Sequence, residues 1–239
     1  MITRELDYAL GDTGYVGSFF VGEDTGGRPG ILVVPEGGGL TDHTRSIAAR
    51  LAEAGYAALA MDYYGGGKAL TDINEVMPRL APWFADPTGI REIATAALNV
   101  LAGQPETNPE ALAAIGYCFG GTTALELGRC GAPLKAIVGF HCGLGTARPA
   151  AAGSMKTKVL VQVGSADPLV PPEHRAAFEA EMTAAGADWR LILMGGIGHS
   201  FTNPNVDALN RPGFAYNAAA DRRSWVAMMD LFGEVFTGF

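Results

Sequence analysis

The sequence predicts a doubly wound α/β fold with a mostly parallel sheet. Short apolar, β-rich runs recur along the 239 residues, and segments with helical periodicity separate them. Several of these runs are continuously apolar, which is typical of strands that are covered on both faces. Strands are expected at 15–21, 30–35, 57–62, 112–117, 136–140, 159–164 and 191–194.

The first expected helix begins at Thr41 and runs toward Gly55, where a glycine ends it. Further helices are expected at 90–101, 120–129, 173–185 and 223–236. No repeat, low-complexity tract or linker interrupts the alternation, so residues 1–239 are expected to form one domain. Doubly wound sheets bind their ligands outside the carboxyl ends of the strands, and the site is expected there.

Composition excludes several classes of protein. Apolar residues make up 48% of the chain and charged residues 18%, so a sizeable core is expected. A formal charge of −8 argues against nucleic acids and anionic membranes as partners. No signal peptide or membrane span is visible, and three unpaired cysteines suit a reducing compartment, so a cytoplasmic protein is expected. Neither metal-ligand spacing nor a dinucleotide or phosphate loop is found, so no cofactor is expected.

The strongest motif is Gly-x-Cys-x-Gly around Cys118. It follows the strand at 112–117 and precedes a helix, as the nucleophile elbow Gly-x-Ser-x-Gly does in α/β hydrolases. The sharp turn requires small neighbours on both sides and places the sulfur at the positive end of the next helix. Most free cysteines are simply small buried apolar residues, but this context favours a nucleophile. The N–H of Phe119 is then a natural oxyanion donor.

The same architecture predicts an acid and then a histidine after the nucleophile. Asp167 follows the strand at 159–164, and His199 follows the strand at 191–194 in a glycine-rich loop. Asp167 also suits a turn before Pro168, and both roles are compatible. We expect His199 to act as the base, with Asp167 fixing its tautomer. The other histidines, His43, His141 and His174, are less suitably placed.

Glu36 is a fourth candidate, because it closes the apolar strand at 30–35 and begins a glycine run. A carboxylate at this strand end is expected near the elbow, although most glutamates are solvated. The N–H of Gly37 is the expected second oxyanion donor, since this loop supplies one in α/β hydrolases.

Four spaced motifs resemble the dienelactone hydrolase (carboxymethylenebutenolidase) family of α/β hydrolases. They are Pro-Glu at 35–36, Gly-Tyr-Cys-Phe-Gly-Gly at 116–121, Gly-Ser-Ala-Asp-Pro-Leu-Val-Pro at 164–171, and Gly-His-Ser-Phe at 198–201. The resemblance implies a mostly monomeric enzyme with a Cys–His–Asp triad, and the sequence itself leaves a dimer open. It also implies that Glu36 accepts the thiol proton when substrate enters.

The resemblance also implies an activity, the hydrolysis of a cyclic enol lactone. In the family this substrate bears a carboxylate, which two arginines hold. One family arginine lies four residues after the histidine, where this chain has Asn203. The other family arginine lies in the region after the third strand, where Arg79 and Arg91 are the two candidates in this chain. Loss of a bidentate clamp costs on the order of 2–3 kcal/mol when the pair is desolvated. The resemblance therefore predicts the type of reaction more firmly than the substrate.

The favoured function is a cysteine-dependent hydrolase of a small-molecule enol lactone or activated ester, acting through an acyl-thioester. A general carboxylesterase or thioesterase of the same fold is the first alternative. The second is a non-catalytic binding protein or redox sensor that uses Cys118 for capture or oxidation. Aromatic residues between the motifs are expected in the core, with a pocket-lining role left open: Tyr63, Tyr64, Trp83, Phe84 and Phe140.

Overall fold

The apolar runs of the sequence form one mixed sheet. The computed structural model describes all residues except 24, 25, 71, 238 and 239. In this described part, eight strands lie in the order β1-β2-β4-β3-β5-β6-β7-β8. Neighbours from β4 to β8 pair in parallel, whereas β1 and β2 pair antiparallel at one edge. The strands are β1 Ile2–Leu10, β2 Thr13–Val21, β3 Arg28–Val34, β4 Ala57–Ala60, β5 Thr107–Tyr117, β6 Ala136–Phe140, β7 Lys158–Gly164 and β8 Trp189–Met194.

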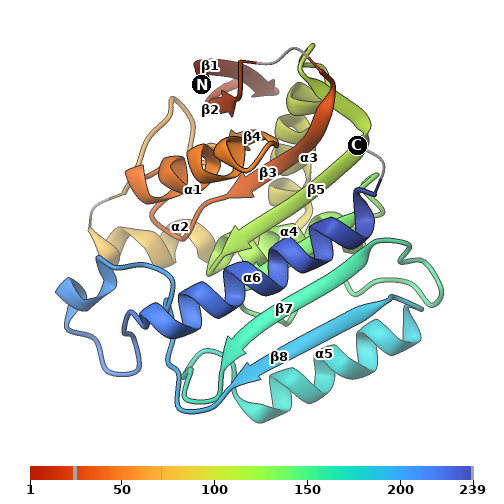
Figure 1. The fold of residues 1–239 in the computed structure, drawn as a ribbon. Coiled ribbons are helices and arrows are strands. Elements are labelled where there is room, and N and C mark those ends of the chain that lie inside the picture. Colours follow the sequence, from red (N-terminus) through yellow and green to blue (C-terminus); the bar gives the residue numbers. More distant parts are fainter. Residues whose placement is uncertain (24–25, 71, 238–239) are drawn as a thin grey trace.

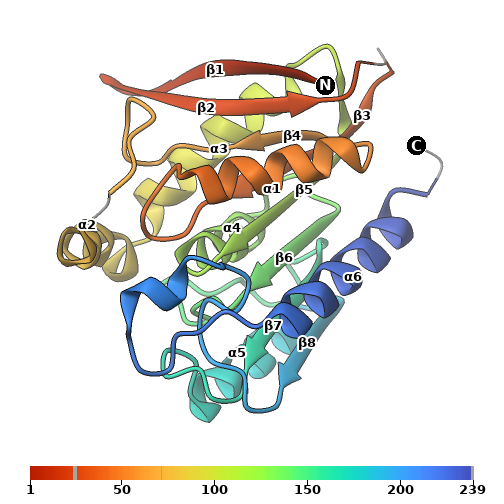
Figure 2. The same ribbon diagram turned by 60° about the vertical axis from the view of Figure 1, so that its left-hand side comes forward.

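Helices cover both faces of this sheet (Figure 1). They are α1 Asp42–Glu53, α2 Ile73–Ala85, α3 Thr88–Ala102, α4 Phe119–Arg129, α5 Pro172–Ala184 and α6 Ala218–Val235, with a short 3₁₀ turn at Val206–Leu209. Helices α1 and α6 share one apolar core on one face, and α3, α4 and α5 share the other. Figure 2 shows α1 and α6 on the same face of the sheet. This three-layer arrangement is the predicted doubly wound α/β fold.

The central strands are buried because helices pack on both of their faces. Residues 31–34 of β3 and all of β6 are fully buried. Their parallel order brings the carboxyl ends of β3, β5, β7 and β8 to the same edge of the sheet. The turns and loops that carry Glu36, Cys118, Asp167 and His199 all leave from that edge. In the described residues, no helix combines the length and apolar content needed to cross a bilayer.

Four elements differ most from the sequence-based expectation, and one of them, β5, begins at Thr107, five residues earlier than expected. The edge strand β1 was not predicted, because its outward positions carry charged side chains such as Glu5 and Asp7. Helix α2 was also not predicted, because it contains Pro78 and Pro82. Helix α6 begins five residues earlier than expected, where the Asn217 side chain accepts a hydrogen bond from the Ala220 N–H at 2.9 Å.

Candidate active site

The strand–turn–helix motif places Cys118 on a tight turn between β5 and α4. Its backbone has φ 54° and ψ −118°, a conformation that side chains rarely adopt. A Cβ on Gly116 would lie 2.1 Å from the Gly120 carbonyl, and one on Gly120 would lie 2.2 Å from the Val34 oxygen. Both glycines are therefore required by close backbone approach, as the motif predicted.

Hydrogen bonds hold this strained turn in place. The Cys118 N–H donates to the Phe140 carbonyl at 3.0 Å, and the Cys118 carbonyl accepts from Gly121 and Thr122. Cys118 is the N-cap of α4 and remains partly exposed, so its sulfur stands at the positive end of that helix. The other two cysteines are also free thiols: Cys130 is exposed and Cys142 is fully buried.

His199 and Asp167 meet at the same edge of the sheet, although 32 residues separate them. His199 Nδ1 and Asp167 Oδ2 lie 2.8 Å apart, and both side chains are buried. Asp167 Oδ1 accepts the Leu169 N–H at 2.8 Å, so the turn that precedes α5 also aims the carboxylate. His199 Nε2 is buried without a hydrogen-bond partner among the described residues. Asp167 thus orients the ring and leaves Nε2 available.

The charge on this histidine depends on its neighbours. Burial lowers the pKa of His199, but the negative charge of Cys118 and the hydrogen bond to Asp167 outweigh it and raise the pKa to about 10. The ring of His141 lies 5.2 Å from that of His199. Burial holds the pKa of His141 well below its usual range, and the charges of His199 and His43 lower it further. A thiolate at Cys118 would therefore favour the imidazolium form of His199, whereas the neighbouring His141 stays neutral.

Glu36 lies at the end of β3 and is held by Asn203. The Asn203 amide Nδ2 donates to Glu36 Oε2 at 2.6 Å, and Glu36 Oε1 is buried without a partner among the described residues. Burial of the carboxyl raises the pKa of Glu36, and the Asn203 hydrogen bond and the positive charge of His199 only partly offset this. The Asn203 side chain, expected to contact substrate, is thus engaged with Glu36 in this structure.

Two backbone N–H groups, one just after β3 and one just after Cys118, are left without an acceptor in the described part of the chain. The N–H groups of Gly37 and Phe119 make no hydrogen bond to any other described residue. Two carbonyls of the loop after β3 are held by tyrosines: the Tyr63 hydroxyl donates to the Glu36 carbonyl, and the Tyr64 hydroxyl donates to the Gly37 carbonyl at 2.7 Å. Tyrosine anchors of this kind had not been predicted, because the aromatic residues at 63 and 64 carried no motif.

The two candidate arginines have different surroundings. Arg91 donates to Glu126 Oε2 and to the Arg148 carbonyl, so its guanidinium is already engaged within α3 and α4. Arg79 is exposed on α2 and makes no ion pair with any described residue. It lies close enough to Tyr64 to lower the pKa of that phenol, against the larger effect of burial that raises it to about 12.

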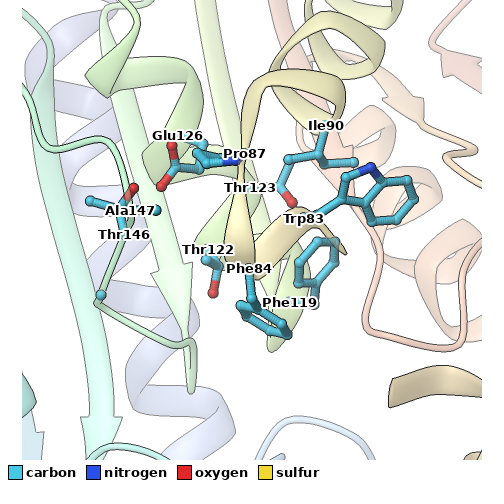
Figure 3. A pocket seen from close by; sticks show the side chains of 11 residues that line it. Trp83, Phe84, Pro87, Ile90, Phe119, Thr122, Thr123, Glu126, Thr146 and Ala147 are labelled. Carbon is cyan, nitrogen blue, oxygen red and sulfur yellow. The ribbon is translucent and has the colours of Figure 1, made fainter. Parts of the chain in front are cut away.

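Helix α2 covers both candidate oxyanion donors. A Cβ on Gly37 would lie 2.8 Å from Val76 Cγ1, and the rings of Trp83 and Phe119 stack with centroids 5.8 Å apart. Figure 3 shows Trp83, Phe84 and Phe119 around a hollow that Thr146 and Ala147 border from the other side. Its volume of about 10 Å³ holds roughly one water molecule. Of the aromatic residues considered in the sequence, Tyr63 and Phe140 are buried in the core, whereas Trp83 and Phe84 line this hollow.

Comparison with known proteins identifies the family of the chain. The profile of the dienelactone hydrolase family matches residues 17–236. A Yersinia pestis protein named "Putative carboxymethylenebutenolidase" is 29% identical over 223 residues, 89% of this chain and 80% of that protein. A Bradyrhizobium protein named "Probable 2-oxo-3-(5-oxofuran-2-ylidene)propanoate lactonase" is 27% identical over 84% of this chain and 82% of its own length.

A solved structure provides a further comparison. The crystal structure of a dienelactone hydrolase-like promiscuous phosphotriesterase from metagenomic libraries superposes with a TM-score of 0.93. It is 42% identical to this chain, and the match covers 98% of each. The parallel sheet and its elbow define an α/β hydrolase. Within that class, the chain belongs to the dienelactone hydrolase family, and it is a hydrolase.

Proposed function

We propose that this hydrolase opens an enol lactone or an activated ester through an acyl-thioester on Cys118. The observation that carries the proposal is the convergence of Cys118, His199 and Asp167 at one sheet edge. The Asp167–His199 contact is 2.8 Å long, and His199 lies close enough to Cys118 for a thiolate to raise its pKa. A nucleophile, a base and an orienting carboxylate are the minimum set for covalent acyl transfer.

In the proposed reaction, the Cys118 sulfur attacks the carbonyl carbon of the substrate. The N–H groups of Gly37 and Phe119 bind the oxyanion, since both lack another acceptor among the described residues. Collapse expels the leaving group, which takes the proton from His199, and forms the thioester. The neutral His199 then activates water, whose attack releases the acid and restores Cys118. A good leaving group such as an enolate is favoured, because a poor alkoxide competes badly with departure of the thiolate itself.

Two groups are candidates to take the thiol proton. His199 is the first, because its Nε2 has no other partner among the described residues. Glu36 is the second, because its buried Oε1 also has no partner in the described part of the chain and burial raises its pKa. In this proposal Asn203 holds Glu36 beside the elbow, and Arg79 is the cation that receives a substrate carboxylate.

The direct test is to trap the acyl-enzyme. Wild-type protein mixed with p-nitrophenyl acetate should gain one acetyl group on Cys118, detected by mass spectrometry after acid quench. Cys118→Ala should lose both the adduct and at least about 99.9% of kcat/KM, as removal of a nucleophile usually does. Cys130→Ala is the matched control, because it removes an exposed thiol outside the elbow and should keep the wild-type rate. Turnover by Cys118→Ala at the wild-type rate would refute the assignment.

Substrate charge is tested separately. A dienelactone that carries a free carboxylate should be preferred over its methyl ester, and Arg79→Leu should abolish that preference while leaving the methyl ester unaffected. Asn203→Arg, measured in parallel, should increase the preference by restoring a second cation. If Arg79→Leu hydrolyses both substrates in the wild-type ratio, Arg79 does not bind the carboxylate.

A second candidate is hydrolysis of phosphotriesters. It is favoured by the 42% identity, over 98% of both chains, to the promiscuous phosphotriesterase. The same thiolate would attack phosphorus, with the phosphoryl oxygen at the N–H groups of Gly37 and Phe119. Diethyl p-nitrophenyl phosphate should release p-nitrophenolate in a Cys118-dependent reaction. A burst of one equivalent without further turnover would make the ester a trapping reagent, not a substrate.

A further inference from the structure

A second hollow lies on the other side of the elbow, between α1 and α6. Its volume is about 170 Å³. Tyr117, the residue before the nucleophile, borders this second hollow, whereas Phe119 borders the hollow of about 10 Å³ beside Trp83. The lining includes His43 and Arg50 of α1, Tyr117 of β5, Tyr216 of the loop before α6, and Asp221 and Trp225 of α6. Cys118 lines neither hollow, so this α1–α6 cavity is a different place from the nucleophile.

Arg50 supplies a cation to this cavity. Its guanidinium carbon lies 3.5 Å from the centroid of the Trp225 ring, and it makes no hydrogen bond or ion pair with any described residue. Stacking occupies the face of a guanidinium and leaves its N–H groups in the plane. Those N–H groups match both oxygens of a carboxylate. The Trp225 ring thus holds Arg50 in a fixed orientation for a planar anion.

Two further groups give the cavity polar character. His43 Nε2 is buried and unpartnered among the described residues, and its ring lies 6.0 Å from that of Tyr117. Burial lowers the pKa of His43, so a neutral imidazole faces the cavity. Asp221 accepts the Tyr216 hydroxyl at 3.3 Å and forms no ion pair with Arg50. It is the one acidic side chain among the lining residues of the cavity.

The size of the cavity limits its ligand to about one aromatic ring. A cavity of roughly 150 Å³ holds a benzene molecule. From His43 to Arg50 the helix rises about 10 Å, so these two side chains mark opposite ends of the part of the lining that α1 contributes. We propose that the α1–α6 cavity is an accessory site for a small planar carboxylate bound by Arg50. Because the proposed hydrolysis releases a carboxylic acid, the product class, if that function holds, includes such ligands.

Calorimetric titration of the wild-type protein with benzoate, and with neutral benzamide as its isostere, tests the site. Benzoate should bind at least tenfold more tightly than benzamide. Arg50→Leu should abolish this difference, and Arg50→Lys should retain part of it, because lysine keeps the charge without the planar stack. Asp221→Asn should tighten benzoate binding severalfold by removing a like charge. Arg223→Leu is the matched control, since it removes an arginine of α6 that does not line the cavity.

Ester hydrolysis separates this site from the nucleophile. Arg50→Leu should hydrolyse p-nitrophenyl acetate at the wild-type rate. Benzoate binding that Arg50→Leu leaves unchanged, or no binding at 10-fold molar excess over about 1 mM protein, would overturn the proposal. So would competitive inhibition by benzoate that persists in Arg50→Leu, because it would place the anion at Cys118. The calorimetric result does not depend on turnover, so an inactive protein would defeat the proposed function alone.

Discussion

At the scale of single residues, the site combines strain with unsatisfied polar atoms. Cys118 holds a positive φ that costs on the order of 1–3 kcal/mol, and the surrounding backbone contacts maintain it. Buried atoms without partners among the described residues, His199 Nε2 and Glu36 Oε1, lie nearby. Such atoms are rare in stable folds and concentrate where a ligand or proton is to be received. The residue scale thus supplies the most direct predictions.

His199 should titrate far above an ordinary histidine. Its folded pKa is raised to about 10 from a reference of 6.5, so the imidazolium stabilises the fold fully below pH 6.5. That contribution is lost as pH rises from 6.5 through 10. Cys118→Ser removes the thiolate charge and should lower the His199 pKa by more than about one pH unit, which corresponds to about 1.4 kcal/mol. NMR titration of the His199 ring protons measures both values.

His141 provides an internal reference in the same spectra, because its pKa lies well below the usual range. It should remain neutral throughout the titration. A His199 pKa that is equal in wild type and Cys118→Ser would show that no thiolate–imidazolium pair exists at rest.

Glu36→Gln should lower the activity, because it removes a proposed acceptor of the thiol proton, and should raise the free energy of unfolding above about pH 4.5. The folded pKa of Glu36 is raised, so the fold favours its protonated form, and wild-type stability declines as pH rises from 4.5 through the folded pKa. Glutamine retains an acceptor for Asn203 but has no such penalty. The variant should therefore become more stable than wild type as the pH rises. The difference in the free energy of unfolding should reach about 1.4 kcal/mol for each pH unit between the unfolded and the folded pKa of Glu36. Urea unfolding at about pH 4.5 and about pH 8 measures the difference, and an equal difference at both would contradict it.

At the scale of elements, the elbow depends on backbones that pass without side chains between them. Gly120→Ala would force a methyl group within 2.2 Å of the Val34 oxygen, so β3 and α4 would have to separate. We expect a loss of about 3 kcal/mol in the free energy of unfolding. Urea unfolding curves provide the measurement.

Gly233→Ala is the control for that substitution. It lies inside α6, is exposed, and has open space around its Cβ direction. Alanine should stabilise the protein there by about 0.5–1 kcal/mol. If both variants change stability by the same amount, close approach is not what requires glycine at the elbow.

At the scale of the whole molecule, a buried ion network joins α3, α4 and α5. Glu126 contacts Arg91 and Arg129, and Arg129 also binds Glu181 at 2.7 Å. The Arg129 side chain is fully buried. Glu126→Leu removes one carboxylate from two arginines and should cost about 3–5 kcal/mol.

The exposed Arg148–Asp86 pair is the matched comparison, because both side chains are more than half exposed. Arg148→Ala should cost less than about 1 kcal/mol. Both losses are measured by urea unfolding, and a Glu126→Leu loss as small as that of Arg148→Ala would show that the network contributes little.

Local features could be predicted from the sequence because their causes lie within a few residues. Continuous apolar runs predicted seven of the eight strands in the described residues, and the strand β6 has the expected bounds. The elbow was also predictable, since glycines at 116 and 120 bracket Cys118. Strand β1 was missed because its charged outward side chains obscured an alternating pattern. Helix α2 was missed because proline penalises an isolated helix, whereas burial of Val76 and Leu80 compensates in the fold.

The sequence alone determined the α/β class and the order of the four motifs at strand ends. Only the tertiary structure decided which side chains meet there. Asn203 and Glu36 are 167 residues apart, and their hydrogen bond depends on how β3 and the loop after β8 are placed. For the same reason, the sequence did not show that Arg91 forms an ion pair with Glu126 or that Arg50 stacks on the Trp225 ring. Motifs fix local backbone geometry, but the partners of long polar side chains are set by packing between distant elements.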